Sequence, residues 1–293
     1  MEEKRFGPIR FIPGINRGKY PYCHSLYIEG AKILIDPASD RERLKKLRDE
    51  EGVEQVWLSH WHEDHFKDLD LFDDLPLGIH PLDAPPLADV ESFLDAYDIE
   101  TPAFRESWRS IVTDMFHFRP RVPQIALEEG SRDLGGLTVE ILHTPGHTPG
   151  HLCFYFKEAG VLFLGDYDLT PFGPWYGDRD SSIAATIESV RKLEKRPAQT
   201  WLTCHETGIF EEQPGHLWSD YLEVINKREN KLLEFLIAPR TREDIITAWI
   251  VYRKEREPVD FYRFAEWAII KKHLDALIET GRIAFEEGRY IKI

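Results

Sequence analysis

The segment Ser59-His60-Trp61-His62-Glu63-Asp64-His65 decides the fold of this chain. It follows an apolar run, residues 53–58, that predicts a short buried strand. Histidine and aspartate side chains are costly to bury unpaired, and both are ligands of transition metals. In an extended segment alternate side chains point to the same side. His60, His62 and Asp64 can therefore converge on one point, while His65 turns toward a second point nearby. The segment predicts two neighbouring metal ions.

The size and composition of the chain fit a soluble globular protein. Its 293 residues suffice for one large domain, or for one large and one small domain. Hydrophobic residues make up 42% and charged residues 30% of the chain. No apolar run approaches a membrane span, and the N-terminus lacks the apolar core of a signal peptide. The three cysteines, Cys23, Cys153 and Cys204, lie far apart and do not suggest a disulfide framework. We therefore expect a cytoplasmic protein without membrane association.

The first two thirds of the chain alternate between strands and helices. Strands are predicted at 6–13, 25–30 and 32–36, followed by an amphipathic helix at 40–50. A helical insertion at about 80–125 comes next, with helices near 89–97 and 102–116, and it is a candidate lid or substrate wall. Further strands are predicted at 137–142, 151–156, 161–164 and 200–203, with a helix at 181–194.

The C-terminal part has a different pattern. Helices are predicted at 214–236, 242–252 and 261–280, followed by a hairpin at 282–293. Three helices and a hairpin resemble a winged-helix module, so we expect one domain at 1–225 and a second at 226–293. Between Lys231 and Lys292 there are 12 basic and 11 acidic residues, in a chain whose formal charge is −15. Packing or homodimer formation by this module is therefore favoured over nucleic-acid binding, which depends on cationic contacts to phosphate.

Three later segments place metal-competent residues directly after predicted strands. They are the run from His143 to His151, the pair Gly165-Asp166, and Cys204-His205-Glu206. With the first segment they supply enough histidine and aspartate ligands for two zinc sites that keep an open position.

These motifs resemble those of the metallo-β-lactamase superfamily. The pattern His-x-His-x-Asp-His, then Thr-Pro-Gly-His-Thr-Pro-Gly-His, then Gly-Asp and a late histidine covers residues 1 to about 225. The resemblance implies an α/β fold, an αββα sandwich with the metal site at one edge, here followed by the small winged-helix-like domain. It implies a first metal site of His60, His62 and His147, a second of Asp64, His65 and His205, and Asp166 as the bridge. Two Zn²⁺ ions are expected, with Fe or Mn as alternatives.

The resemblance also implies the reaction. A hydroxide that bridges two metal ions would attack the substrate, and Asp64 would have a catalytic role in orienting it. The β-lactamases of the superfamily usually carry Cys where this chain has Asp166, and flavodiiron members replace the residue matching His62 by a carboxylate. The chain is more similar to glyoxalase II and ribonuclease Z. We therefore expect a zinc-dependent hydrolase of a small-molecule ester, thioester or lactone.

Two alternatives stay open: an endoribonuclease or phosphodiesterase with a winged-helix tail, and a mononuclear iron persulfide dioxygenase. Among the histidines outside the ligand set, His151 is the best candidate for supporting a ligand. The turn-rich aromatic segment after Asp166 is a candidate pocket wall. In it we expect Tyr167, Trp175 and Tyr176 to contact the substrate.

Overall fold

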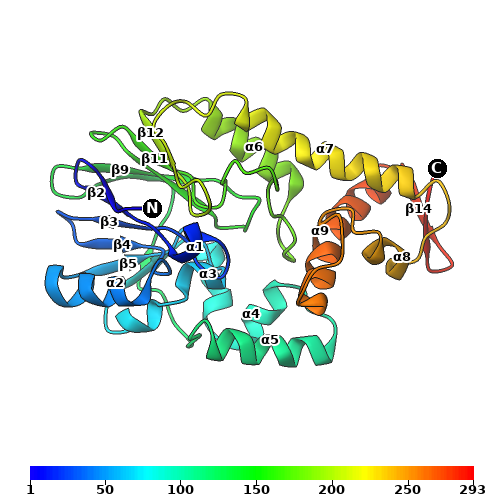
Figure 1. The fold of residues 1–293 in the computed structure, drawn as a ribbon, viewed down its shortest axis with the longest axis horizontal. Helices are drawn as coiled ribbons and strands as arrows, with labels where there is room; N and C mark the ends of the chain where they lie inside the picture. Colours follow the sequence, from blue (N-terminus) through cyan, green and yellow to red (C-terminus); the bar gives the residue numbers. More distant parts are fainter.

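Two stacked β-sheets form the centre of the computed structural model, which describes residues 1–293 (Figure 1). The first sheet has the order β1-β2-β3-β4-β5-β6-β7. Its strands are β1 (Lys4–Phe6), β2 (Ile9–Ile12), β3 (Ser25–Ile28), β4 (Ile33–Ile35), β5 (Gln55–Trp57), β6 (Leu77–Ile79) and β7 (Ile125–Ala126). Pairing is antiparallel from β1 to β4 and parallel from β4 to β7.

The second sheet has the order β13-β12-β11-β10-β9-β8. Its strands are β8 (Gly130–Asp133), β9 (Thr138–His143), β10 (Leu152–Phe156), β11 (Val161–Phe163), β12 (Thr200–Leu202) and β13 (Ile209–Phe210). Only β11 and β12 pair in parallel, because α6 (Ile183–Glu194) connects them.

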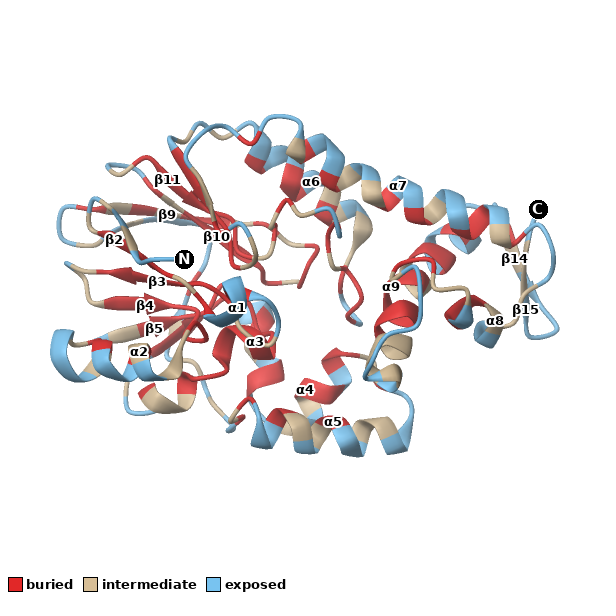
Figure 2. Cartoon of the chain, in the orientation of Figure 1, coloured by how far each residue is buried: buried red, intermediate tan, exposed pale blue.

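Apolar side chains from both sheets fill the space between them. Trp57 of the first sheet and Phe154 of the second are fully buried, with ring centroids 5.8 Å apart. Strands buried on both faces read as continuous apolar runs, as in Val161–Phe163, and Figure 2 shows the inner strands as almost entirely buried. Helices cover the two outer faces, so the predicted αββα sandwich is confirmed.

The outer face of the first sheet carries α2 (Arg41–Lys46), α3 (Glu63–Phe66) and the insertion between β6 and β7. The insertion contains 3-10 turns at Pro81–Asp83 and Pro85–Leu87, α4 (Val90–Ala96) and α5 (Pro102–Asp114). Asp89 caps α4 through the amide of Ser92, and Pro102 stands in the first turn of α5, where its missing N–H costs nothing. The buried flank of α5 packs Trp108 and Val112 into one core with Phe66 and Phe93.

The second sheet is covered by α6 and by the long helix α7 (Leu217–Phe235). Trp218 and Tyr221, in the first half of α7, pack against the sheet core. Ile225, Leu232 and Leu233 pack instead with the C-terminal elements. Residue 226, the expected domain boundary, therefore lies inside a continuous helix that joins two cores.

The remaining C-terminal elements are α8 (Arg242–Thr247), α9 (Val259–Glu279) and the hairpin β14 (Ile283–Glu286) and β15 (Arg289–Lys292). Their order matches the predicted helices and hairpin. Figure 1 shows α9 extending from the end of α7 toward α4 and α5. No helix of the chain is long and apolar enough to cross a membrane.

The first predicted strand differs from the structure. Residues 6–13 do not form one strand, because the chain reverses at Gly7, which has a φ of 59°, and makes the β1–β2 hairpin. The strands β6, β7, β8 and β13, of two to four residues each, were not predicted from the sequence.

Candidate metal centre

The candidate ligands meet at one edge of the sandwich, where four strands end. His60 and His62 lie in the loop after β5, and His147 follows β9. Asp166 follows β11 and His205 follows β12. Asp64 and His65 belong to α3, the short helix that begins directly after His62.

The first group consists of three imidazoles and one carboxylate. Nε2 of His60 lies 3.0 Å from Nδ1 of His62 and 3.1 Å from Nε2 of His147, and the last two nitrogens are 3.0 Å apart. Oδ2 of Asp166 lies 3.3 Å from Nε2 of His147. All four ligand atoms lie within 4.8 Å of one another. Ligands about 2.0–2.1 Å from one tetrahedral ion stand roughly 3.3 Å apart, so these spacings fit a metal ion.

Each histidine of this group has an inner ring nitrogen, which faces the other two rings, and an outer ring nitrogen, which faces the surrounding protein. The partners of the outer nitrogens show that the inner nitrogens carry lone pairs. Nδ1 of His147 donates to the carbonyl of Trp175 at 3.2 Å, and Nε2 of His62 donates to Asp178 at 2.8 Å. Nδ1 of His60 lies 3.0 Å from Oγ of Ser59, whose own proton goes to Asp36. The three inner nitrogens therefore point lone pairs at one another in a buried site. Such an arrangement is repulsive unless a cation stands between them.

The protonation of His62 reflects the same need for positive charge. Burial lowers the pKa of its imidazole, but the carboxylate of Asp178 outweighs burial and raises this pKa to about 9. His60 has no carboxylate at its outer nitrogen, and burial together with His65 holds its pKa well below the ordinary value. One proton on His62 would thus take the place of the cation.

The second group lies on the other side of Asp166. Oδ1 of Asp166 is 3.0 Å from Nε2 of His65 and 3.2 Å from Nε2 of His205. Oδ2 of Asp64 is 3.7 Å from Nε2 of His205. Because each oxygen of Asp166 faces a different histidine group, this carboxylate has the position that a bridge between two ions requires.

Two observations indicate that a cation also fits this second group. Nε2 of His65 and Oδ1 of Asp166 are buried without a hydrogen-bond partner. Burial opposes charge on His205, yet Asp166 and Asp168 raise its pKa to about 10. The candidate ligands of this group therefore include carboxylates whose charge and hydrogen-bonding capacity the protein itself does not fully balance.

Asp36 and Ser59 support this set, and sequence reasoning gave neither a role. The carboxylate of Asp36 accepts from the amide of Ser59 at 2.8 Å and from its hydroxyl at 2.7 Å. Oδ2 of the same carboxylate lies 3.2 Å from Nδ1 of His65. A carboxylate behind a ligand histidine fixes the ring and makes it a stronger ligand. The signal available in the sequence was an acid at the end of β4, the strand beside β5.

Asp178 is the second residue that the sequence did not reveal. It is fully buried, and besides His62 it accepts a hydrogen bond from Nε1 of Trp175 at 2.9 Å. Ser181 donates to the carbonyl of His147 at 2.6 Å. The segment 175–181 thus orients two of the three histidines of the first group. Nothing in the local pattern distinguishes Asp178 from the other acids of that loop.

His151 lies where a supporting role would place it. Its Nε2 accepts the amide proton of Asp166 at 3.2 Å, and its Nδ1 lies 2.9 Å from Oγ1 of Thr144. Asp168 accepts the amide proton of His205 at 2.9 Å. Both contacts fix the backbone of a candidate ligand.

Tyr167 and Tyr176, which we expected to contact the substrate, lie in the interior. Tyr167 is fully buried, and its hydroxyl donates to the carbonyl of Thr144 at 3.0 Å. Tyr176 is also fully buried, and its hydroxyl forms a hydrogen bond with Nε2 of His273 at 2.9 Å. Both rings pack in the interior because their hydroxyls find partners there. Trp175 is half-buried beside His147 and Asp178, so it stays a candidate substrate contact.

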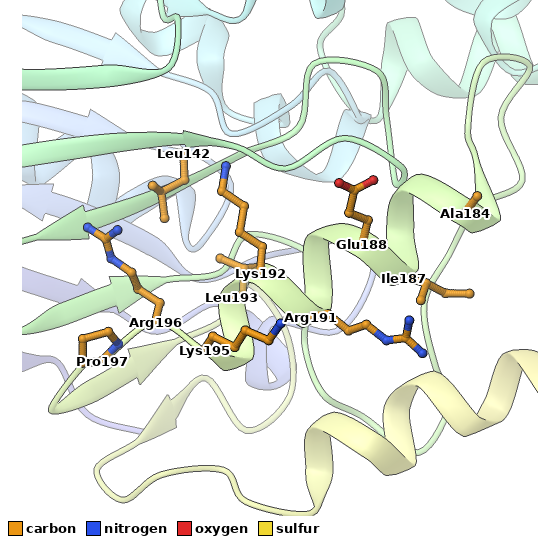
Figure 3. A pocket seen from close by; sticks show the side chains of 10 residues that line it. All are labelled: Leu142, Ala184, Ile187, Glu188, Arg191, Lys192, Leu193, Lys195, Arg196 and Pro197. Carbon is orange, nitrogen blue, oxygen red and sulfur yellow. The ribbon is translucent and has the colours of Figure 1, made fainter.

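One cavity lies away from this centre. It has a volume of about 740 Å³ and follows α6, where Arg191, Lys192, Lys195 and Arg196 line it (Figure 3). Arg196 pairs with Glu140 and Lys192 with Glu129, so acidic neighbours offset part of its charge. A smaller cavity of about 230 Å³ reaches Asp178 and Trp61, behind His62.

The profile of the Metallo-beta-lactamase superfamily matches residues 20–205 of this chain. A solved metallo-beta-lactamase family protein from Thermus thermophilus superposes with a TM-score of 0.71 at 21% identity, covering 98% of this chain and 99% of that one. A beta-lactamase domain protein from Burkholderia ambifaria gives 0.70 at 16% identity, covering 100% and 94%. At these identities the two likenesses show a common fold.

Two relatives with named activities match different shares of this chain. The atrochrysone carboxyl ACP thioesterase of Pseudocercospora fijiensis is 23% identical over 96% of this chain and 78% of its own length. The hydroxyacylglutathione hydrolase of Hahella chejuensis is 38% identical over 36% of this chain and 42% of its own length. The chain thus spans less than half the length of that hydrolase.

Proposed function

This chain belongs to the metallo-beta-lactamase superfamily, and we propose that it is a dinuclear metal-dependent hydrolase that cleaves a thioester. The observation that carries the proposal is the position of Asp166, whose two oxygens face two separate histidine groups. His60, His62 and His147 would hold one ion, Asp64, His65 and His205 the other, and Asp166 both. Zinc suits a set of imidazole and carboxylate ligands, and iron and manganese are alternatives.

Two such ions, when bound, supply a water-derived nucleophile near neutral pH and stabilise developing negative charge. The residues of the chain have their own tasks. Asp64 keeps 10% of its side-chain area exposed, so one of its oxygens can accept a proton from the attacking water and orient it. Asp36, Asp178 and the carbonyls of Gly18 and Trp175 fix the ligand rings.

The thioester is favoured over the other candidate bonds by the relatives. One relative is an ACP thioesterase and matches almost the whole chain, and others are hydroxyacylglutathione hydrolases, whose substrates join an acyl group to a thiol. A thiolate leaves readily, so its departure needs no buried general acid.

A substrate panel tests the proposal. The metal content of the protein is first measured as purified. The protein is then loaded with zinc and assayed on acyl thioesters, simple esters, lactones, a phosphodiester and single-stranded RNA. We expect two ions per chain and a kcat/KM for thioesters at least tenfold above the other classes. Turnover of RNA or phosphodiester alone would overturn the assignment, and so would one iron per chain with no hydrolysis.

A further inference from the structure

Five aromatic side chains form a continuous row beside the metal centre, and we infer that they bind an aromatic acyl group of the substrate. This inference rests on the proposed thioester hydrolysis. The row, which we call the aromatic wall, consists of Phe172, Tyr252, Tyr262, Phe261 and Tyr20. Successive ring centroids are 5.5, 5.0, 5.3 and 5.7 Å apart.

The aromatic wall ends close to the open side of the metal centre. The hydroxyl of Tyr20 donates to Glu63 at 2.9 Å, and Glu63 is the residue before Asp64. Asp64, Asp166 and His205 keep 10%, 12% and 13% of their side-chain area exposed, whereas His60 and His65 keep none. A substrate carbonyl must therefore approach along the side that Asp64 occupies, next to Tyr20.

The wall exposes apolar surface at both of its ends. Tyr20 is 42% exposed and Phe172 is 39% exposed, and the three rings between them are half-buried. Contiguous apolar surface of this kind, beside a candidate active site, is typical of a ligand-binding surface.

Tyr20 is also held in place. Its ring packs against the buried ring of Phe116 at 5.8 Å, and Glu63 holds its hydroxyl. Glu63 is itself fixed, because Tyr97 donates to its other oxygen at 2.5 Å. A ring that cannot turn away loses little conformational entropy when a substrate packs on it, which favours binding.

Contacts outside the wall also join α9 to the sandwich. Phe264 of α9 packs on Phe104 at 5.1 Å, and Lys272 donates to the carbonyls of Arg179 and Ser181. The exposed faces of Tyr20 and Phe172 are therefore not required to join the C-terminal elements to the sandwich.

The chemistry of the wall selects among acyl groups. Arg228 lies over the ring of Phe172, and Arg256 lies over the rings of Tyr252 and Tyr262. No such cation covers Tyr20 and Phe261, the rings nearest Asp64. An aromatic acyl group gains from offset stacking on them in addition to burial, whereas an aliphatic chain gains only from burial. A bound acyl group would place its carbonyl near Asp64 and Asp166 and its ring against Tyr20 and Phe261. An acetyl group has no ring to stack on the wall.

The test compares three acyl groups on one thiol: acetyl, octanoyl and phenylacetyl, the last two with equal carbon counts. Because the wall contacts the substrate away from the reacting bond, its loss should act on KM rather than on kcat. For Phe261→Ala and Tyr20→Ala we expect the KM for the phenylacetyl thioester to rise about tenfold. The KM for octanoyl should rise less, and that for acetyl should change less than twofold.

Phe285→Ala is the matched control, since Phe285 is 53% exposed on β14, outside the wall. Circular dichroism and thermal unfolding of each variant exclude a loss of fold as the cause. Equal effects on phenylacetyl and octanoyl, or on acetyl as well, would overturn the inference. These outcomes leave thioester hydrolysis itself intact. If no thioester is cleaved by the unmodified protein, the proposed function fails first, so the two failures can be told apart.

Discussion

Oδ2 of Asp178 lies 2.8 Å from Nε2 of His62, although 116 residues separate them in the sequence. Both side chains are buried, and the contact fixes the ring so that Nδ1 points at His60 and His147. The loop after β11 and the loop after β5 are thereby joined at the metal centre. Asp178 is not itself a candidate ligand, but it fixes the orientation of one, His62.

Asp178→Asn should weaken metal binding at the first group by about 10–100-fold, the usual effect of losing such a supporting carboxylate. An amide cannot balance the charge of a histidine that binds a cation. Titration with a chromophoric chelator measures the affinity. Asp180→Asn is the control, because Asp180 is exposed and pairs only with Arg179. Unchanged affinity in Asp178→Asn would contradict the supporting role.

Removal of a ligand tests the two-ion arrangement. We expect His62→Ala to lose one of two bound ions, and Asp64→Ala to lower kcat by about 100-fold or more. A chelator should abolish activity, and added zinc should restore it. Asp74→Ala, which removes an exposed carboxylate paired only with Arg48, serves as the control. Full activity of Asp64→Ala with both ions bound would show that this carboxylate does not act on the water.

The dense histidine segment allowed prediction of the candidate site because spacing alone brings its candidate ligands together. His60, His62 and His65 belong to one loop and one helical turn, so no tertiary information was needed. The later residues His147, Asp166 and His205 could be placed because each follows a predicted strand, and the ends of neighbouring strands meet at one edge. The layers of the sandwich followed from the same strands.

Other parts depend on contacts between distant segments. Asp178 and Asp36 act only through rings that tertiary folding brings to them, and no local pattern separates them from surface acids. Tyr167 and Tyr176 seemed suited to a pocket by their place in the sequence, but carbonyl and imidazole partners within the core hold their hydroxyls. The aromatic wall combines four segments and was equally invisible, since only Phe172 belongs to the aromatic loop.

The turn α1 (Ile15–Gly18) gives a further prediction for the second group. Asn16, Arg17 and Gly18 all have positive φ, of 52°, 61° and 61°. This left-handed turn brings the carbonyl of Gly18 to Nδ1 of His205. A Cβ at Gly18 would stand 2.9 Å from the carbonyl oxygen of Cys204, and the left-handed backbone costs other residues about 1–2 kcal/mol.

Gly18→Ala should therefore displace His205 and lower the metal content from two ions per chain toward one, together with a lower melting temperature. Elemental analysis and calorimetry measure both effects. Gly30→Ala is the matched control, because a Cβ there meets nothing within 4 Å. If Gly18→Ala keeps both ions, the turn does not position His205.

The contact between α7 and the C-terminal hairpin gives a prediction about pH. The carboxylate of Glu229 lies 3.9 Å from Nδ1 of His273 and pairs with Arg282, just before β14. These two groups hold the pKa of Glu229 down to about 2, below its ordinary value of 4.5. A depressed carboxyl pKa stabilises the folded state above pH 4.5, and this contribution is lost as the pH falls from 4.5 toward 2.

Glu229→Gln should consequently lower the urea midpoint at pH 7, and the difference from the unmodified protein should shrink steadily between pH 4.5 and the lowest pH at which both proteins fold. Glu234→Gln, on the same helix but without an ion pair, should show no such dependence because its carboxylate lacks a cationic partner. A difference in midpoint that stays constant as the pH falls would mean that Glu229 contributes by packing and not by charge.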